Sequence, residues 1–144
     1  MALLSGLTAK RPSAVGVKNG KLQACDLEKS NCVCSQHKPE GRVLGPHYVQ
    51  PFAFEGDPAD AMTRVMAVLL QQKNCRIVVN RPDYLHAEFT TAVLGLIDDV
   101  EFLLSAPEQV IHVRSASRLG LSDFGVNRAR VKDLREAFDE ADEE

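Results

Sequence analysis

The sequence has 144 residues and a formal net charge of −3, with 44% hydrophobic and 26% charged residues and no Trp. This length is typical of one domain, and a chain of this size can fold without a disulfide or a metal. The apolar fraction excludes a disordered chain, and the mild acidity argues against a general nucleic-acid-binding protein. We expect a single domain over residues 1–144.

The charges are unevenly distributed along the chain. Residues 83–108 contain six acidic residues and no Lys or Arg, whereas residues 109–130 contain four Arg and one Asp. Blocks of opposite charge either pair on folding or face different partners. We expect these two blocks to pair, and we expect the acidic end of the chain, residues 139–144, to be a flexible tail.

The N-terminal third, residues 1–46, has no clear periodicity and is interrupted by Gly and Pro residues. Such a length is long for a loop, so we expect a mostly irregular arm that wraps around the fold. The apolar start is too short for a signal peptide, and no apolar run reaches the roughly 18 residues of a membrane helix. We expect a cytoplasmic protein without a membrane span.

A short strand and a helix are predicted next. Residues 47–54 suit a strand that Pro51 confines to an edge or a bulge. Asp57 is a suitable N-cap and Pro58 a suitable first helical residue, so a helix is expected from there to about Gln72. Its predicted inner face consists of apolar residues at helical spacing, namely Met62, Val65, Met66, Leu69 and Leu70.

Four strands and a second helix complete the predicted fold. The strands cover residues 76–80, 84–91, 96–104 and 109–115, and their short connections imply antiparallel neighbours. The closing helix, for which Asn127 is the predicted N-cap, presents Val131, Leu134 and Phe138 on its inner face. We predict an α+β two-layer sandwich, a four-stranded antiparallel meander with two helices packed on one face.

The face of the meander away from the helices gathers polar residues, because strand side chains alternate between faces. These residues are His86, Glu88, Asp99, Glu101, His112 and Arg114. The favoured interpretation is a solvated face with cross-strand charge pairs. A second interpretation is a ligand cleft beneath the arm, in which Tyr84, His86 and Arg114 orient a small molecule.

A third interpretation is that this face binds a metal or performs acid–base catalysis. A divalent metal could be held by His86, Glu88 and His112, or Glu88 or Glu101 could act with a histidine in acid–base catalysis. No His-x-x-His or His-Glu-x-x-His spacing supports this interpretation.

The segment 114–130 combines four Arg with Ser, Gly and a predicted helix start. Arg forks and the N–H groups of a helix N-terminus bind anions, so the segment could form an anion pocket. The favoured alternative is internal pairing, with Arg114 beside Glu101 or Glu88. Asp123 would then fix an Arg or the loop backbone.

The four cysteines do not have the spacing of a zinc site, since Cys32 and Cys34 are too close and Cys25 lacks a near partner. A disulfide between Cys25 and Cys32 is sterically feasible, although a reducing cytosol would oppose it. Cys75 is expected to be a buried small apolar residue.

Several segments resemble the domain of unknown function 1499 family. They are residues 10–22, Cys25, and residues 30–33, 84–89, 98–102, 110–118 and 125–128, which follow in order over about residues 10 to 138. The resemblance implies a cyanobacterial or chloroplast-like protein without an established general activity. It also implies that Cys25 and Cys32 form a disulfide or a redox-sensitive pair, whereas Cys34 stands where the family has Ser.

We predict a noncatalytic binding or accessory protein, without cofactor or metal, whose partner is a small anion or another protein. The candidate ligand-binding residues lie on the polar sheet face and in the arginine segment: His86, Glu88, Glu101, His112, Arg114, Ser117, Arg118, Asp123, Asn127 and Arg128. The alternatives are an enzyme that uses the His–carboxylate cluster, and a protein–protein interaction module. The sequence does not indicate an oligomeric state.

Overall fold

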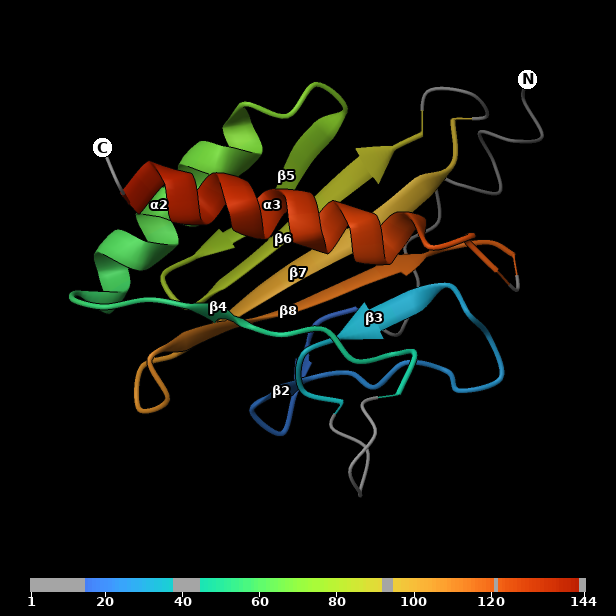
Figure 1. Cartoon of the computed structure of the whole chain (residues 1–144), viewed down its shortest axis with the longest axis horizontal. Helices are drawn as coiled ribbons and strands as arrows, with labels where there is room; N and C mark the ends of the chain where they lie inside the picture. The colour runs from blue at the N-terminus through green and yellow to red at the C-terminus, as the bar shows by residue number, and fades with distance from the viewer. Residues whose placement is uncertain (1–14, 38–44, 92–94, 121, 143–144) are drawn as a thin grey trace.

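A six-stranded antiparallel sheet carries two helices on one face and the N-terminal segment, residues 15–37, on the other (Figure 1). The computed structural model describes residues 15–37, 45–91, 95–120 and 122–142. The elements are β1 (Val17–Lys18), β2 (Lys21–Leu22), β3 (Cys32–Cys34), β4 (Phe52–Ala53), α2 (Pro58–Leu70), β5 (Cys75–Arg81), β6 (Tyr84–Thr90), β7 (Ile97–Ser105), β8 (Val110–Ser117) and α3 (Val126–Asp142).

The predicted four-stranded meander forms the centre of the sheet as β5 to β8, but the sheet is wider than predicted. Its strand order is β3-β8-β7-β6-β5, and β4 also pairs with β8. The edge of β8 offers unpaired backbone groups, and these are satisfied by β3 near Arg114 and by β4 near Ile111. Part of the arm predicted to be irregular is therefore a strand of the sheet.

Helix α2 begins as predicted. The Asp57 side chain accepts a hydrogen bond from the N–H of Ala59, and Pro58 is the first helical residue. The predicted inner face is wrong at its end, because Leu70 is 69% exposed. Ala61 and Val68 are buried instead, so the buried face centres on Val65 and turns away from Leu70.

Helix α3 buries Val131, Leu134 and Phe138, as predicted. The predicted N-cap is wrong, because Asn127 lies inside the first turn and Asp123 accepts hydrogen bonds from the N–H groups of Gly125 and Asn127. The helix continues to Asp142, so most of the acidic segment predicted to be a flexible tail is helical.

Two separate apolar clusters hold the sheet between its covering layers. The first joins the helices to the sheet and includes Phe102 and Phe138, whose rings lie 5.6 and 5.4 Å from that of Phe52. The second lies on the opposite face and joins residues of the N-terminal segment to the sheet: Leu22, Cys25, Cys32, Cys34, Tyr84, Leu103 and Ala116. Both faces of the sheet are consequently covered.

At the far edge of the sheet, β5 pairs with β6 through an irregular register, with a bulge between Ile77 and Val79. Neither α2 nor α3 is long and apolar enough to cross a membrane.

Candidate functional site

The polar face of the sheet is buried rather than solvated. His86, Asp99 and Glu101 are at most 1% exposed, and Glu88, His112 and Arg114 are at most 9% exposed. The N-terminal segment covers them through the second apolar cluster. The favoured interpretation of an exposed charge ladder is therefore wrong.

Asp99 is the centre of a charged network on this face. Arg118 donates to both Asp99 oxygens at 2.8 and 2.9 Å and also pairs with Glu88, while Nε2 of His86 lies 2.7 Å from Asp99 Oδ1. Burial alone would raise the pKa of Asp99, but the hydrogen bonds from Arg118 and His86 outweigh it and hold that pKa below its ordinary value. The arginine segment thus pairs with the acidic block, as expected, and Arg130 extends the pairing to Asp98 at 2.7 Å.

Glu101 forms a second buried pair on the same face. It accepts hydrogen bonds from the Tyr84 hydroxyl at 2.6 Å and from the N–H of Gly16 at 2.7 Å. Burial and then the hydrogen bond to Glu101 raise the pKa of the Tyr84 hydroxyl. Arg114 Nη1 lies 3.5 Å from Glu101, and Arg114 Nε is buried without a hydrogen-bond partner among the described residues.

His112 lies in a different arrangement, which has the composition of a catalytic triad. Its Nδ1 is 3.0 Å from Ser35 Oγ and its Nε2 is 3.2 Å from Glu108 Oε1. Ser35 is fully buried, and its Oγ accepts a hydrogen bond from the N–H of Val113, so no substrate can reach it in this conformation. These contacts join His112 on β8 to Ser35, which directly follows β3.

The three residues considered for metal binding, His86, Glu88 and His112, are not assembled into one site. Within the described ranges, no group of three or more His, Cys, Asp or Glu side chains has an arrangement that could hold a metal ion.

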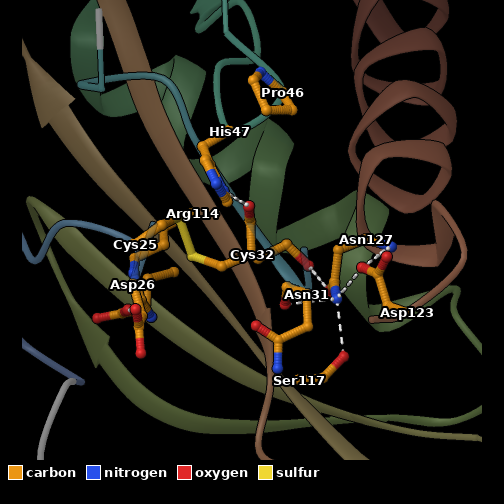
Figure 2. Close-up of a disulfide and its surroundings, with 12 residues drawn as sticks. Cys25, Asp26, Asn31, Cys32, Pro46, His47, Arg114, Ser117, Asp123 and Asn127 are labelled. Carbon is orange, nitrogen blue, oxygen red and sulfur yellow. Dashed lines mark hydrogen bonds and ion pairs between the residues drawn. A yellow bond between two sulfur atoms is a disulfide. The ribbon is translucent and has the colours of Figure 1, made fainter. Parts of the chain in front are cut away.

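Asn127 is fully buried and links the arm to the start of α3 (Figure 2). Its Nδ2 donates to Asp123 Oδ2 at 2.7 Å, to Ser117 Oγ at 2.9 Å and to the carbonyl oxygen of Asn31 at 3.2 Å. Three predicted site residues, Ser117, Asp123 and Asn127, are thus brought together. Arg128 makes different contacts and donates to the carbonyl oxygens of Pro46 and Tyr48.

Cys25 and Cys32 form a disulfide with a Cα–Cα distance of 5.6 Å, and both residues are 5% exposed (Figure 2). The bond closes the loop 26–31, which we call the disulfide loop.

Cys34 and Cys75 are free. Burial raises the pKa of the Cys34 thiol, and burial raises that of Cys75 to about 11, so both thiols are poor nucleophiles near neutral pH.

A cavity of about 340 Å³ lies between the disulfide loop and the sheet. We call it the disulfide-loop pocket. Its wall contains the disulfide, donors from the loop and the polar ends of β7 and β8: Ala24, Cys25, Asp26, Lys29, Asn31, Cys32, Asp99, Arg114, Ala116, Ser117 and Arg118. Lys29 and Asn31 were not among the predicted site residues, because only the closure of the disulfide loop brings them to the sheet.

The fold is an α+β sheet covered by helices on one face and by a disulfide-containing segment on the other, with a polar pocket beneath that segment. A family model described as Protein of unknown function (DUF1499) matches residues 21–138, and the chain belongs to this family. No curated protein sequence matches the chain.

Proposed function

We propose that the protein is a noncatalytic binding protein that holds a small anion in the disulfide-loop pocket. The observation that carries the proposal concerns Arg114. This residue lines the pocket, and its positive charge is only partly balanced by a nearby carboxylate. Among the described residues, its ion pair is with Glu101 at 3.5 Å, and its Nε has no hydrogen-bond partner. A buried donor without an acceptor costs about 1–3 kcal/mol, which a bound anion could relieve by drawing the guanidinium toward it.

The chemistry of the pocket wall supports this class of ligand. Lys29 contributes a second cation from the disulfide loop, and Ser117 accepts a hydrogen bond from Asn127, which leaves its hydroxyl proton available for another acceptor. Asp26 and Asp99 also line the pocket. Arg118 neutralises Asp99 with two hydrogen bonds, and Asp26 accepts a hydrogen bond from the N–H of Glu28. A phosphate, a sulfate or a short carboxylate matches these donors.

The enzymatic alternative has less support. His86 is 1% exposed and hydrogen-bonded to Asp99, and the Ser35–His112 pair is buried. A general acid or base must come within hydrogen-bond reach of a substrate, and neither histidine does so in this conformation.

The disulfide bears on location as part of the same proposal. Buried disulfides persist in oxidising compartments and are rare in the cytosol, so Cys25–Cys32 favours an oxidising compartment over the cytoplasmic location expected from the sequence. The cyanobacterial or chloroplast-like origin implied by the resemblance stays a prediction.

Calorimetric titration with inorganic phosphate, sulfate and acetate tests the proposal. We expect saturable binding of at least one anion, and Lys29→Ala should weaken it about fivefold, the upper range for one exposed ion pair. Lys73→Ala removes the same charge from an exposed residue outside the pocket and should leave the affinity unchanged. Arg114→Lys keeps the charge but loses the planar fork, and it should also weaken binding.

Absence of saturable binding by all three anions would contradict the proposal. So would an affinity that neither Lys29→Ala nor Arg114→Lys changes.

A further inference from the structure

A second cavity, of about 510 Å³, is lined by residues of α3 and of the segment 45–50. We call it the α3 groove. Arg128, Lys132 and Arg135 line one side, and Pro46, Tyr48 and Gln50 lie among the residues of the other. The described residues that line it include three cations and no carboxylate.

The three cations form one stripe along the helix. Residues 128, 132 and 135 are spaced i, i+4 and i+7, which puts them on the same helix face over about 10 Å. A compact anion would engage one or two of them, whereas a ligand that engages all three must be extended along the helix axis.

The charges of these cations are only partly compensated inside the molecule. Arg128 donates to the carbonyl oxygens of Pro46 and Tyr48, and Arg135 donates to that of Gln50, so these hydrogen-bond partners are neutral. Asp139 and Glu136 on the same helix offset part of the Arg135 charge from a distance. Arg135 Nε is buried without a partner among the described residues, and burial lowers the pKa of this guanidinium. Lys132 has an exposed contact with Glu136 at 3.9 Å.

The charge of Arg128 also opposes the stability of the helix N-terminus. The first turn of α3 has no acidic residue and its last turn has no basic residue. A cation near the positive N-terminal end of a helix destabilises it by about 0.3–1 kcal/mol, and Arg128 lies in that first turn. A cation at the positive end of a helix is a departure from the usual charge preference, and such departures are expected at positions that function requires.

We propose that the α3 groove binds an extended acidic peptide segment of a partner protein. Charge complementarity and the length of the stripe carry the inference. An extended peptide rises about 3.3 Å per residue, so carboxylates on alternate residues repeat every ~7 Å, and a five-residue segment presents three of them over ~13 Å, enough to reach all three cations. This site is separate from the disulfide-loop pocket and does not depend on its ligand.

Fluorescence anisotropy of a dye-labelled hexaglutamate peptide tests the inference. We expect saturable binding to the full chain at low salt, weakened by added salt, and no binding of hexalysine. Lys132→Glu should weaken the binding at least about fivefold, because it replaces an attraction by a repulsion at the centre of the stripe. The matched control Lys73→Glu makes the same charge change on an exposed residue outside the groove and should alter affinity less than about twofold.

Lys132 is chosen because its contact with Glu136 lies on the surface, so the fold should tolerate its replacement; circular dichroism checks this. Lys132→Ala should give a smaller loss in the same direction. Lys29→Ala should leave peptide binding intact, and Lys132→Glu should leave phosphate binding intact, so either proposal can fail without the other.

Three outcomes would overturn the inference. Equal losses in Lys132→Glu and Lys73→Glu would mean that only net charge matters. Displacement of the peptide by millimolar inorganic phosphate would indicate a compact anion site. Binding of phosphatidylglycerol vesicles without binding of the peptide would indicate a membrane surface.

Discussion

At the scale of single residues, Asp99 shows how one buried carboxylate organises a polar face. It is 1% exposed, yet both of its oxygens accept hydrogen bonds, from Arg118 and from His86. A buried charge with partners on each oxygen is stable only while all partners are present. The stability of the protein should therefore depend on the ionisation of this residue.

We predict that Asp99→Asn lowers the free energy of unfolding at neutral pH by about 3 kcal/mol, the lower end for a broken buried ion pair, because Arg118 loses the carboxylate that accepts two of its hydrogen bonds but keeps its pairing with Glu88. Since the folded-state pKa of Asp99 is lowered, its contribution is present above the unfolded-state pKa and is lost as pH falls through the folded-state pKa. The variant should consequently lose less stability in acid than the wild type.

Urea denaturation at a series of pH values from neutral to strongly acidic measures this difference. The exposed Asp133→Asn is the matched control and should follow the wild-type profile. An Asp99→Asn profile parallel to that of the wild type would contradict the prediction.

The sequence predicted the placement of these residues better than their environment. Strand alternation put His86, Glu101 and Arg114 on the face away from the helices, and they lie there. It could not predict their burial, because the docking of the arm depends on apolar contacts between residues far apart in the chain. The pairing of Arg118 with Asp99 could not be predicted without the strand register. The number of charges alone does not show which of the four arginines pairs with Asp99.

At the scale of elements, the disulfide loop joins the arm to the end of β8. The bond spans residues separated by seven positions, and the Asn31 carbonyl oxygen accepts hydrogen bonds from Asn127 and from the N–H of Ser117. The loop is thus fixed at both of its cysteines and at its polar end.

We predict that the double variant Cys25→Ala/Cys32→Ala lowers the free energy of unfolding by about 2.5 kcal/mol, because the unfolded chain regains the entropy of an open loop. Chemical denaturation measures the loss, which should equal that caused by reducing the wild type. Unfolded, unreduced wild type should expose two reactive thiols, from Cys34 and Cys75. Four thiols, or an unchanged free energy, would contradict the prediction.

The long elements were predictable and the short ones were not. The two helices and the strands β5 to β8 have periodic patterns that extend over several residues. By contrast, β3 has three residues and β4 two, too few for a period, and both form because the edge of β8 is unpaired. The N-cap of α3 was misplaced because Asp123 caps the turn through a loop that precedes the helix.

At the scale of the whole molecule, the arm is a structural layer. Leu22, on β2, is 5% exposed and belongs to the cluster that contains Tyr84 and Leu103. Removing such a side chain loses its transfer free energy and leaves a cavity.

We predict that Leu22→Ala lowers the free energy of unfolding by about 2–5 kcal/mol, as in an ordinary core. Leu27→Ala is the matched control, because Leu27 belongs to the same arm but is 63% exposed, and it should change stability by less than about 0.5 kcal/mol. Urea denaturation compares the two. If both variants are as stable as the wild type, the arm does not contribute to folding.

The bulge in β5 has a consequence for the behaviour of the protein at high concentration. A regular edge strand is a template on which another chain can add a strand, and such addition leads to aggregation. The bulge between Ile77 and Val79 disturbs the spacing of the free edge, and the Arg76 side chain next to it is 75% exposed. At the opposite edge, β3 and β4 are too short to recruit a strand. Among the described residues, neither edge offers a long regular strand, so we expect that copies of this chain do not polymerise through the sheet.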